Sequence, residues 1–208
     1  MSPADRRMQD RYPEQFEALR VRARPDSAPP DAPRIGDFTS TFTGRRFWPL
    51  DPRPEDIDLR DIARALSMQC RWGGHVREFI SVAQHSVLVA EHLPVGLALR
   101  GLLHDAAEAY LVDVPSPIKK YLIGYGKIEA RLLSVIGERF GIPYLDVMTE
   151  EVRIEDVRAL ATEQRDLRKP VDGWEPPMAP WREHIYSWSP SQAEGYFRGV
   201  AASLGLLR

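Results

Sequence analysis

Two polar side chains interrupt an apolar stretch near the middle of the chain. His104 and Asp105 lie within LALRGLLHDAAEAYL, residues 97–111, where adjacent polar residues are costly to bury without a partner. A divalent cation would be such a partner, because imidazole nitrogen and carboxylate oxygen are good ligands for first-row metals. A core pair satisfied without a metal is the structural alternative. The sequence therefore indicates a candidate metal site at His104 and Asp105.

The spacing of two further residues brings them to the same place. Glu108 follows His104 by four positions, which puts both on one face of the expected helix, with Asp105 turned by about 100°. A lone glutamate can equally be an ordinary exposed residue. His85 stands in the preceding apolar segment VAQHSVLVAEHL, residues 82–93, and two antiparallel helices with a short loop would bring it opposite His104 unless it is a core histidine.

The elements that position these residues are expected to be helices. Apolar residues at helical spacing, capping side chains and terminal Gly or Pro mark each one. The expected helices cover residues 59–68 with Asp58 as cap, 82–93, 97–111 up to Pro115, about 128 to 141, 150–167, and 190–204 with a Ser189–Gln192 capping box. Residues 38–50 alternate aromatic and polar residues and suit a short hairpin or extended segment. The expected fold class is all-α.

Composition limits the function classes. The 208 residues are 43% hydrophobic, and 28 Lys and Arg stand against 30 Asp and Glu, so the net charge of −2 argues against bulk attraction to nucleic acid or membranes. The lone Cys70 excludes an intramolecular disulfide framework and favours the cytoplasm. Residues 1–37 are expected to form a flexible arm and residues 38–208 one domain, with no membrane segment.

The order His85, His104-Asp105 and a later aspartate closely resembles the H…HD…D signature of the HD-domain phosphohydrolases. The likeness runs from about residue 43 to 167. It includes RRFWPLDP, CRWGGH, SVAQHSVLVAEHL, HDAAEAYLVDVPSPIKKYL and EDVRALATEQRDL. This pattern is similar to the branch of bacterial deoxynucleoside 5′-nucleotidases and phage-type deoxyadenosine triphosphate phosphohydrolases. The resemblance implies an HD-domain helical bundle.

The resemblance also implies metal ligands. These are His85, His104, Asp105 and Asp156. For the last ligand, Glu155, Asp146 and Asp166 lie close enough in sequence to remain alternatives, and an acidic residue near a helix N-terminus is often only solvated. One divalent cation (Co²⁺, Mn²⁺, Zn²⁺ or Mg²⁺) would be held, and whether a second joins with a triphosphate substrate stays open.

Roles in substrate binding and proton transfer follow from the same likeness. Glu108 matches the catalytic carboxylate, and Asp113 matches an aspartate that contacts the sugar hydroxyl or supports the metal-bound water. Arg71-Trp72 matches a pair that lines the nucleotide pocket, Gly74 would leave room for the base edge, and Lys119 aligns near the phosphates. Packing, surface or loop positions are the alternatives for Arg71, Trp72, Asp113 and Lys119. His75 and His92 are expected to be structural or surface residues.

The resulting functional expectation is a metal-dependent enzyme that removes phosphate from deoxynucleoside mono-, di- or triphosphates, with deoxyadenosine-type substrates favoured. Homo-oligomers are expected by resemblance, and the Trp-rich segment around His184 could contribute to their interface. Alternatives are another HD phosphodiesterase, acting on guanosine polyphosphates or cyclic nucleotides, and a catalytically silent nucleotide-binding protein. A nucleic-acid-binding helical bundle is disfavoured by the balanced charge.

Overall fold

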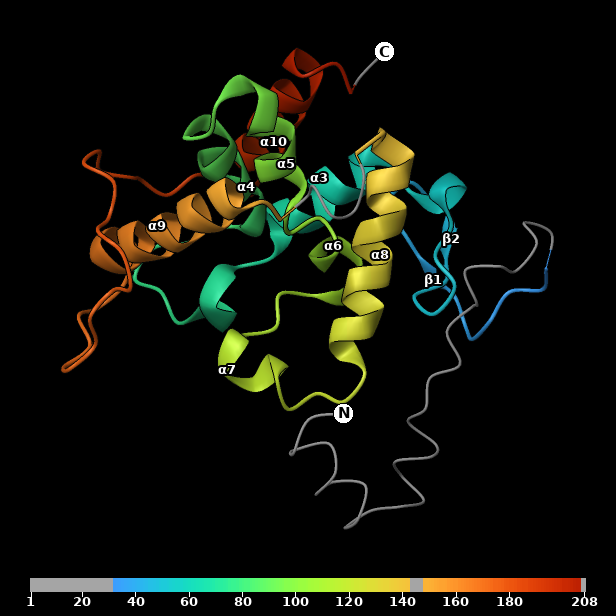
Figure 1. Cartoon of the computed structure of the whole chain (residues 1–208), viewed down its shortest axis with the longest axis horizontal. Coiled ribbons are helices and arrows are strands. Elements are labelled where there is room, and N and C mark those ends of the chain that lie inside the picture. The colour runs from blue at the N-terminus through green and yellow to red at the C-terminus, as the bar shows by residue number, and fades with distance from the viewer. Residues whose placement is uncertain (1–31, 143–147, 207–208) are drawn as a thin grey trace, which may run out of the picture.

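A computed structural model describes residues 32–142 and 148–206, and the regular elements of this part are helices apart from one two-stranded hairpin (Figure 1). The all-α expectation is therefore confirmed. Most of the expected arm, residues 1–37, lies outside the described residues. Among the described helices, none is both long and apolar enough to cross a membrane.

The expected hairpin is present and is attached to the first long helix. Strands β1 (Thr39–Ser40) and β2 (Arg46–Phe47) pair in antiparallel register. The carboxylate of Asp61 on α3 (Leu59–Met68) accepts hydrogen bonds from the backbone N–H and the hydroxyl of Thr43, at 2.7 and 2.9 Å. These bonds fix the hairpin to the start of α3.

Helix α4 (Val82–Glu91) is the central element of the fold. Its residues from Val82 to Ala90 are all buried, and the Ser81 hydroxyl caps its start by accepting the Gln84 N–H. Helix α5 (Val95–Leu103) runs back along α4. Because α4 is buried on all sides, other elements must cover it from several directions.

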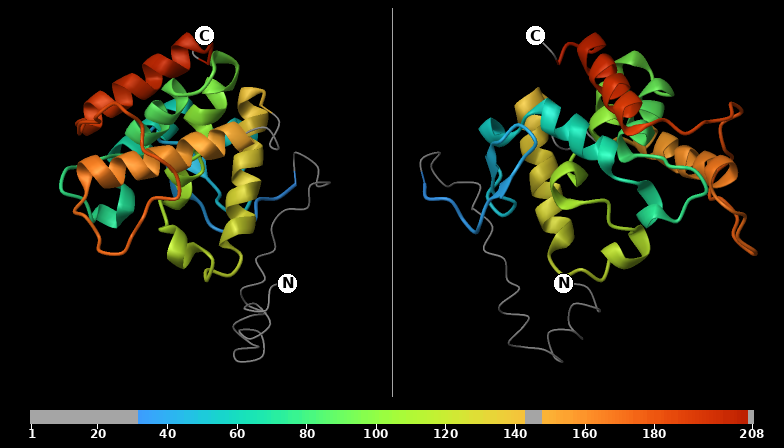
Figure 2. Two further views of the ribbon diagram at one scale, coloured as in Figure 1. Left: turned by 60° about the vertical axis from the view of Figure 1, so that its left-hand side comes forward. Right: turned by 180° about the vertical axis from the view of Figure 1, so that it is seen from behind.

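Two longer helices cover α4 from different directions. Helix α9 (Glu150–Leu167) contacts α4 and α5, whereas α10 (Pro190–Ser203) packs on α3, α4 and α5 (Figures 1 and 2). Helix α4 consequently contributes to two clusters of buried apolar side chains, one with α3, α5, α8 and α10 and one with α9 and the following strap. The strap is the irregular segment 173–188.

The remaining elements are short except for one helix. They are the 3-10 helices η1 (Pro54–Asp56) and η2 (Arg71–Gly74) and the helices α6 (Glu108–Leu111), α7 (Ser116–Lys119) and α8 (Tyr125–Phe140). Helix α8 ends at Gly141, whose φ of 73° is readily adopted by glycine. Segments η2, α6 and α7 surround the region where the functional residues gather.

Three expected helices are confirmed almost residue for residue, and α3 and α10 are capped as predicted. Helices α3 and α9 have the predicted bounds, and α10 begins at Pro190 after the Ser189–Gln192 capping box. The prediction of one helix over residues 97–111 is wrong, because α5 ends at Leu103 and α6 begins at Glu108.

The break has a local cause at His104. Its Nδ1 donates to the carbonyl of Gly101 at 2.7 Å, the acceptor that the Asp105 N–H would use in a continuing α-helix. The chain tightens instead, with i to i+3 bonds from Ala106 to Leu103 and from Glu108 to Asp105. With about three residues per turn, Asp105 rather than His104 shares a side with Glu108.

Gly101 permits the close approach of α4 and α5 that brings the two histidines together. A Cβ at this position would lie 2.5 Å from Leu93 Cδ1 and 3.1 Å from the Ala90 Cα. Leu93 can rotate, but the backbone of Ala90 cannot move without shifting α4. In contrast, a Cβ at Gly199 on α10 would meet no atom within 4 Å.

We expect Gly101→Ala to lower the free energy of unfolding by about 1–3 kcal/mol through this overpacking. Gly199→Ala is the matched control, and it should raise stability by about 0.5–1 kcal/mol because alanine favours the helix. Urea denaturation of the two variants measures both effects. Equal or greater stability of Gly101→Ala would show that the contact between α4 and α5 is not tight.

Candidate metal centre

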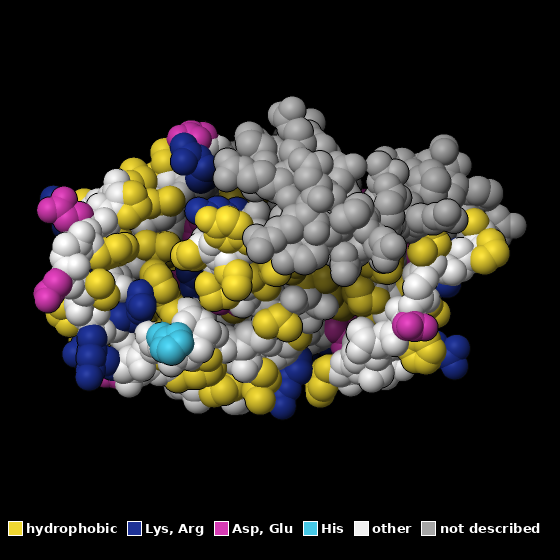
Figure 3. All heavy atoms as spheres, turned by 90° about the horizontal axis from the view of Figure 1, so that it is seen from below, with side chains coloured by type: hydrophobic (Ala, Val, Ile, Leu, Met, Phe, Trp, Pro, Cys, Tyr) yellow, Lys and Arg dark blue, Asp and Glu magenta, His cyan; other side chains and the backbone are white. Residues whose placement is uncertain are grey.

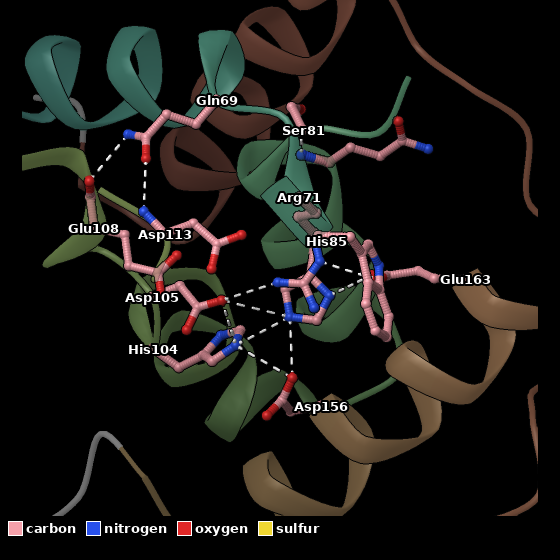
Figure 4. A network of polar contacts seen from close by, with 12 residues as sticks. Gln69, Arg71, Ser81, His85, His104, Asp105, Glu108, Asp113, Asp156 and Glu163 are labelled. Atoms are coloured by element: carbon pink, nitrogen blue, oxygen red, sulfur yellow. Dashed lines mark hydrogen bonds and ion pairs between the residues drawn. The ribbon is translucent and has the colours of Figure 1, made fainter. Parts of the chain in front are cut away.

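The imidazoles of His85 on α4 and His104 after α5 point at one another. Their Nε2 atoms are 3.2 Å apart, and both side chains are buried (Figure 4). Each Nδ1 has its own partner: His85 Nδ1 lies 2.7 Å from Glu163 Oε1, and His104 Nδ1 lies 2.7 Å from the Gly101 carbonyl oxygen. When both Nδ1 atoms donate, the Nε2 lone pairs face each other and require a shared cation or proton.

Two carboxylates complete this cluster of donors. Asp105 Oδ2 lies 3.2 Å from His104 Nε2 and 3.6 Å from His85 Nε2. Asp156 Oδ1 lies 3.1 Å from His85 Nε2 and 3.9 Å from His104 Nε2. Ligands held at about 2.1 Å from one ion are about 3.0–4.2 Å apart, depending on the angle between them. The four distances above and the 3.2 Å between the two Nε2 atoms fall in this range.

The donor set therefore fits a divalent cation. His85, His104 and Asp105 form a compact group that could hold a metal ion. Asp156 lies outside this compact group but close to both imidazoles, so it would have to move toward Asp105 to become a fourth donor to the same ion. Two imidazole nitrogens with carboxylate oxygens suit Mn²⁺, Co²⁺, Fe²⁺ or Zn²⁺.

The neighbours of Asp156 on α9 have other partners. Glu155 accepts a hydrogen bond from the indole N–H of Trp181 at 2.7 Å, and Asp166 accepts the Ile185 N–H at 3.0 Å. Both carboxylates thus fasten the strap to α9. Asp146, the remaining alternative from the sequence, lies outside the described residues.

Glu163 is a central residue of the site that the sequence analysis missed. Its carboxylate is completely buried and accepts from Arg71 Nε at 3.0 Å and from Trp72 Nε1 at 2.8 Å, besides contacting His85. Glu163 follows Asp156 by seven residues, which is two helical turns. That spacing could have revealed a second inward carboxylate on α9.

The electrostatics of the cluster favour a positive charge. Three carboxylates lie against the two imidazoles, and Arg71 beside them offsets part of their charge. These carboxylates belong to Asp105, Asp156 and Glu163. Although burial opposes protonation, Asp105 and Asp156 raise the pKa of His104 to about 9. The same negative field that holds a proton there attracts a metal ion.

Glu108 and Lys119 lie together beside this cluster. Burial, with the charges of Asp105 and Asp113, raises the pKa of Glu108 to about 9. Its Oε1 is 3.7 Å from Lys119 Nζ, and its buried Oε2 has no hydrogen-bond partner among the described residues. Lys119 also pairs with Glu129 on α8. Within the described structure, one Glu108 oxygen is therefore available to form a hydrogen bond with a bound molecule.

The side chains of η2 occupy one side of the site. Arg71 is largely buried and lies 3.5 Å from Asp105 through Nη1. Trp72 has a left-handed backbone, with φ 60°, and one face of its ring is covered by the Arg168 guanidinium at 4.0 Å. Base stacking on Trp72 remains a prediction, and it would have to use the other face. A Cβ at Gly74 would meet open space.

The other histidines lie outside this cluster. His92 stacks on Trp181 with ring centroids 3.7 Å apart, and His184 Nδ1 is 2.9 Å from Asp166 Oδ1. His75 is exposed, and its carbonyl accepts a hydrogen bond from Arg168.

The described part of the face seen from below carries hydrophobic side chains around a recess that contains basic and acidic groups (Figure 3).

No family model matches the chain. It is 43% identical over 130 residues to the uncharacterized protein YfdR of Escherichia coli K12, a match that covers 62% of this chain and 72% of YfdR. It is also 40% identical over 112 residues to an uncharacterized protein of Rhodobacter capsulatus, covering 49% of this chain and 57% of that protein. The chain belongs to the family of YfdR.

The choice of Asp156 over its neighbour can be tested by a pair of variants. Asp156→Asn should weaken the binding of Mn²⁺ or Co²⁺ because it removes a charged oxygen donor from the cluster. Glu155→Gln should retain metal affinity but lower the melting temperature, since it weakens the bond to Trp181. Isothermal titration calorimetry and thermal melts give the two readings. The reverse pattern would assign the ligand to Glu155.

Glu163→Gln should lower metal affinity by about 10- to 100-fold, because the variant loses the negative charge that orients His85 and increases its basicity. Glu150→Gln on the same helix is the control, since Glu150 is exposed and, within the described part of the chain, its ion pair is with the nearby Arg153. Titration of metal-stripped protein measures both. Unchanged affinity in Glu163→Gln would mean that this carboxylate serves the fold alone.

Proposed function

We propose that the protein is a metal-dependent phosphohydrolase of the HD superfamily that removes phosphate from deoxynucleotides. The observation that carries the proposal is the compact group of His85, His104 and Asp105, with Asp156 beside the imidazoles and both Nδ1 atoms held by other partners. Their sequence order is that of the H…HD…D signature. A bound divalent cation would supply a Lewis acid for a phosphoryl oxygen and an activated water.

Glu108 is the group in this proposal that moves protons. Because its raised pKa keeps it protonated at neutral pH, Glu108 can deliver a proton to the departing 5′ oxygen, and once ionised it can accept one from water. The Glu108 side chain is buried at the edge of the cluster and near Lys119. Lys119 can stabilise negative charge on the phosphoryl oxygens without leaving the neighbourhood of Glu108.

Arg71 and Asp113 would bind the two ends of the substrate. Arg71 faces Asp105 and Glu163 and can redirect a guanidinium N–H to a phosphate. Asp113 is half-buried beside Glu108, where it can accept a hydrogen bond from a sugar hydroxyl. A deoxyadenosine-type nucleoside with one to three phosphates is the proposed substrate class. A homo-oligomer in the cytoplasm is part of the same proposal.

The test is release of phosphate and nucleoside from a panel of deoxy- and ribonucleoside mono-, di- and triphosphates by metal-stripped protein with added Mn²⁺, Co²⁺, Zn²⁺ or Mg²⁺. His104→Ala should abolish turnover and metal binding. Glu108→Gln should bind metal normally but lower kcat by about 10²–10⁴-fold. His184→Ala, at the exposed end of the strap, should behave as wild type.

The panel also distinguishes the alternatives. Metal binding with no turnover of any nucleotide in this panel would contradict the proposal and point to guanosine polyphosphates or cyclic nucleotides as substrates, or to a silent binding protein. Turnover that persists in His104→Ala would place the chemistry elsewhere in the chain.

A further inference from the structure

Gln69 joins the two ends of the segment that carries the acidic residues beside the metal centre. Its Nε2 donates to the Glu108 carbonyl oxygen at 3.0 Å, and its Oε1 accepts from the Asp113 backbone N–H at 3.0 Å (Figure 4). One carboxamide therefore satisfies both a backbone acceptor and a backbone donor, five residues apart. Neither group can keep its partner if the segment unwinds.

The chain between those ends is strained at Val112. Its φ of 73° and ψ of 146° lie in a region that is nearly restricted to glycine, and Val112 is β-branched. The conformation is held from both sides: its N–H donates to the Glu108 carbonyl at 2.9 Å, and its carbonyl accepts the Tyr125 hydroxyl at 3.0 Å. Strain of this kind persists only where surrounding contacts enforce it.

Gln69 also links two parts of the site. It ends α3 as its C-cap residue and stands two positions before Arg71, whose guanidinium contacts Asp105. The next residue, Cys70, forms an isolated β-bridge with Ser81 at the start of α4. The backbone around Gln69 is thus anchored to the helix that bears His85.

We propose that Gln69 is a positioning residue that fixes Glu108 and Asp113 at a set separation across the strained Val112. The Nε2 donor of Gln69 holds the backbone of Glu108, the proposed proton-transfer residue. The Oε1 acceptor holds the backbone of Asp113, the proposed sugar-binding residue. The kinetic part of this inference rests on the proposed function. The structural part, that Gln69 holds the segment from Glu108 to Asp113, does not.

Two substitutions separate the roles of the donor and the acceptor in the Gln69 carboxamide. Gln69→Leu removes both bonds at similar size, and it should lower kcat/KM by about 10- to 100-fold through misplacement of both carboxyl groups. Gln69→Glu keeps an acceptor for the Asp113 N–H but loses the donor to the Glu108 carbonyl. It should hold KM within about twofold of wild type and lower kcat by at least about tenfold.

Gln84→Leu is the matched control for general damage. Gln84 is a buried glutamine that also bridges two backbone groups, donating to the Tyr186 carbonyl and accepting the Trp188 N–H on the strap. The Gln84→Leu variant should lose about as much stability as Gln69→Leu, while its kcat and KM stay near the wild-type values. Metal affinity should be unchanged in both Gln69 variants, since no proposed ligand is touched.

Amide hydrogen exchange gives a reading that needs no substrate. The Asp113 amide and its neighbours from Glu108 onward should exchange faster in Gln69→Leu and remain protected in Gln84→Leu. If these amides were as protected in Gln69→Leu as in the wild type, or if that variant kept the wild-type kcat and KM, the inference would be overturned while the proposed function stayed intact. Wild-type protein without turnover would overturn the proposed function, and the exchange rates would then decide the positioning role alone.

Discussion

The structure depends on one electrostatic constraint: two buried imidazoles and the carboxylate of Asp105 form a compact group of cation ligands, with Asp156 beside the imidazoles. The two imidazoles present their Nε2 atoms to each other at 3.2 Å while carboxylates approach from α9 and from the turn after α5. Without a cation or proton between them, this arrangement would be repulsive. The helices that supply these groups are held in place by contacts at a distance from the point itself, such as the close approach at Gly101.

Much of the scaffold could be predicted because its signals are local. Caps and apolar spacing indicated α3, α9 and α10 with nearly correct bounds, and the pairing of His85 with His104 followed from two short apolar helices in sequence. The break at His104 could not be read from spacing, since it results from a side chain taking a backbone acceptor. Propensity alone favours a continuous helix through residues 97–111.

The supporting residues of the site were harder to predict. Glu163 and Gln69 act through partners 78 and 39 positions or more away in sequence, His85 and Glu108, so nothing beside them in the chain suggests their roles. For Glu163, the seven-residue spacing from Asp156 was the only local sign. For Gln69 there was none, because its side chain bonds only to backbone atoms among the described residues, and every residue type carries the same backbone atoms. Together these two residues connect α3, α4 and α9 to the residues of the candidate metal site.

The most direct test of the central claim is the anomalous difference density of a crystal grown from metal-stripped protein and soaked with Mn²⁺. The account predicts one strong peak within about 2.0–2.3 Å of His85 Nε2, His104 Nε2 and a carboxylate oxygen of Asp105, with Asp156 beside it. A peak only at surface carboxylates, or none within reach of the two imidazoles at neutral pH, would contradict the claim that the fold is built around a cation.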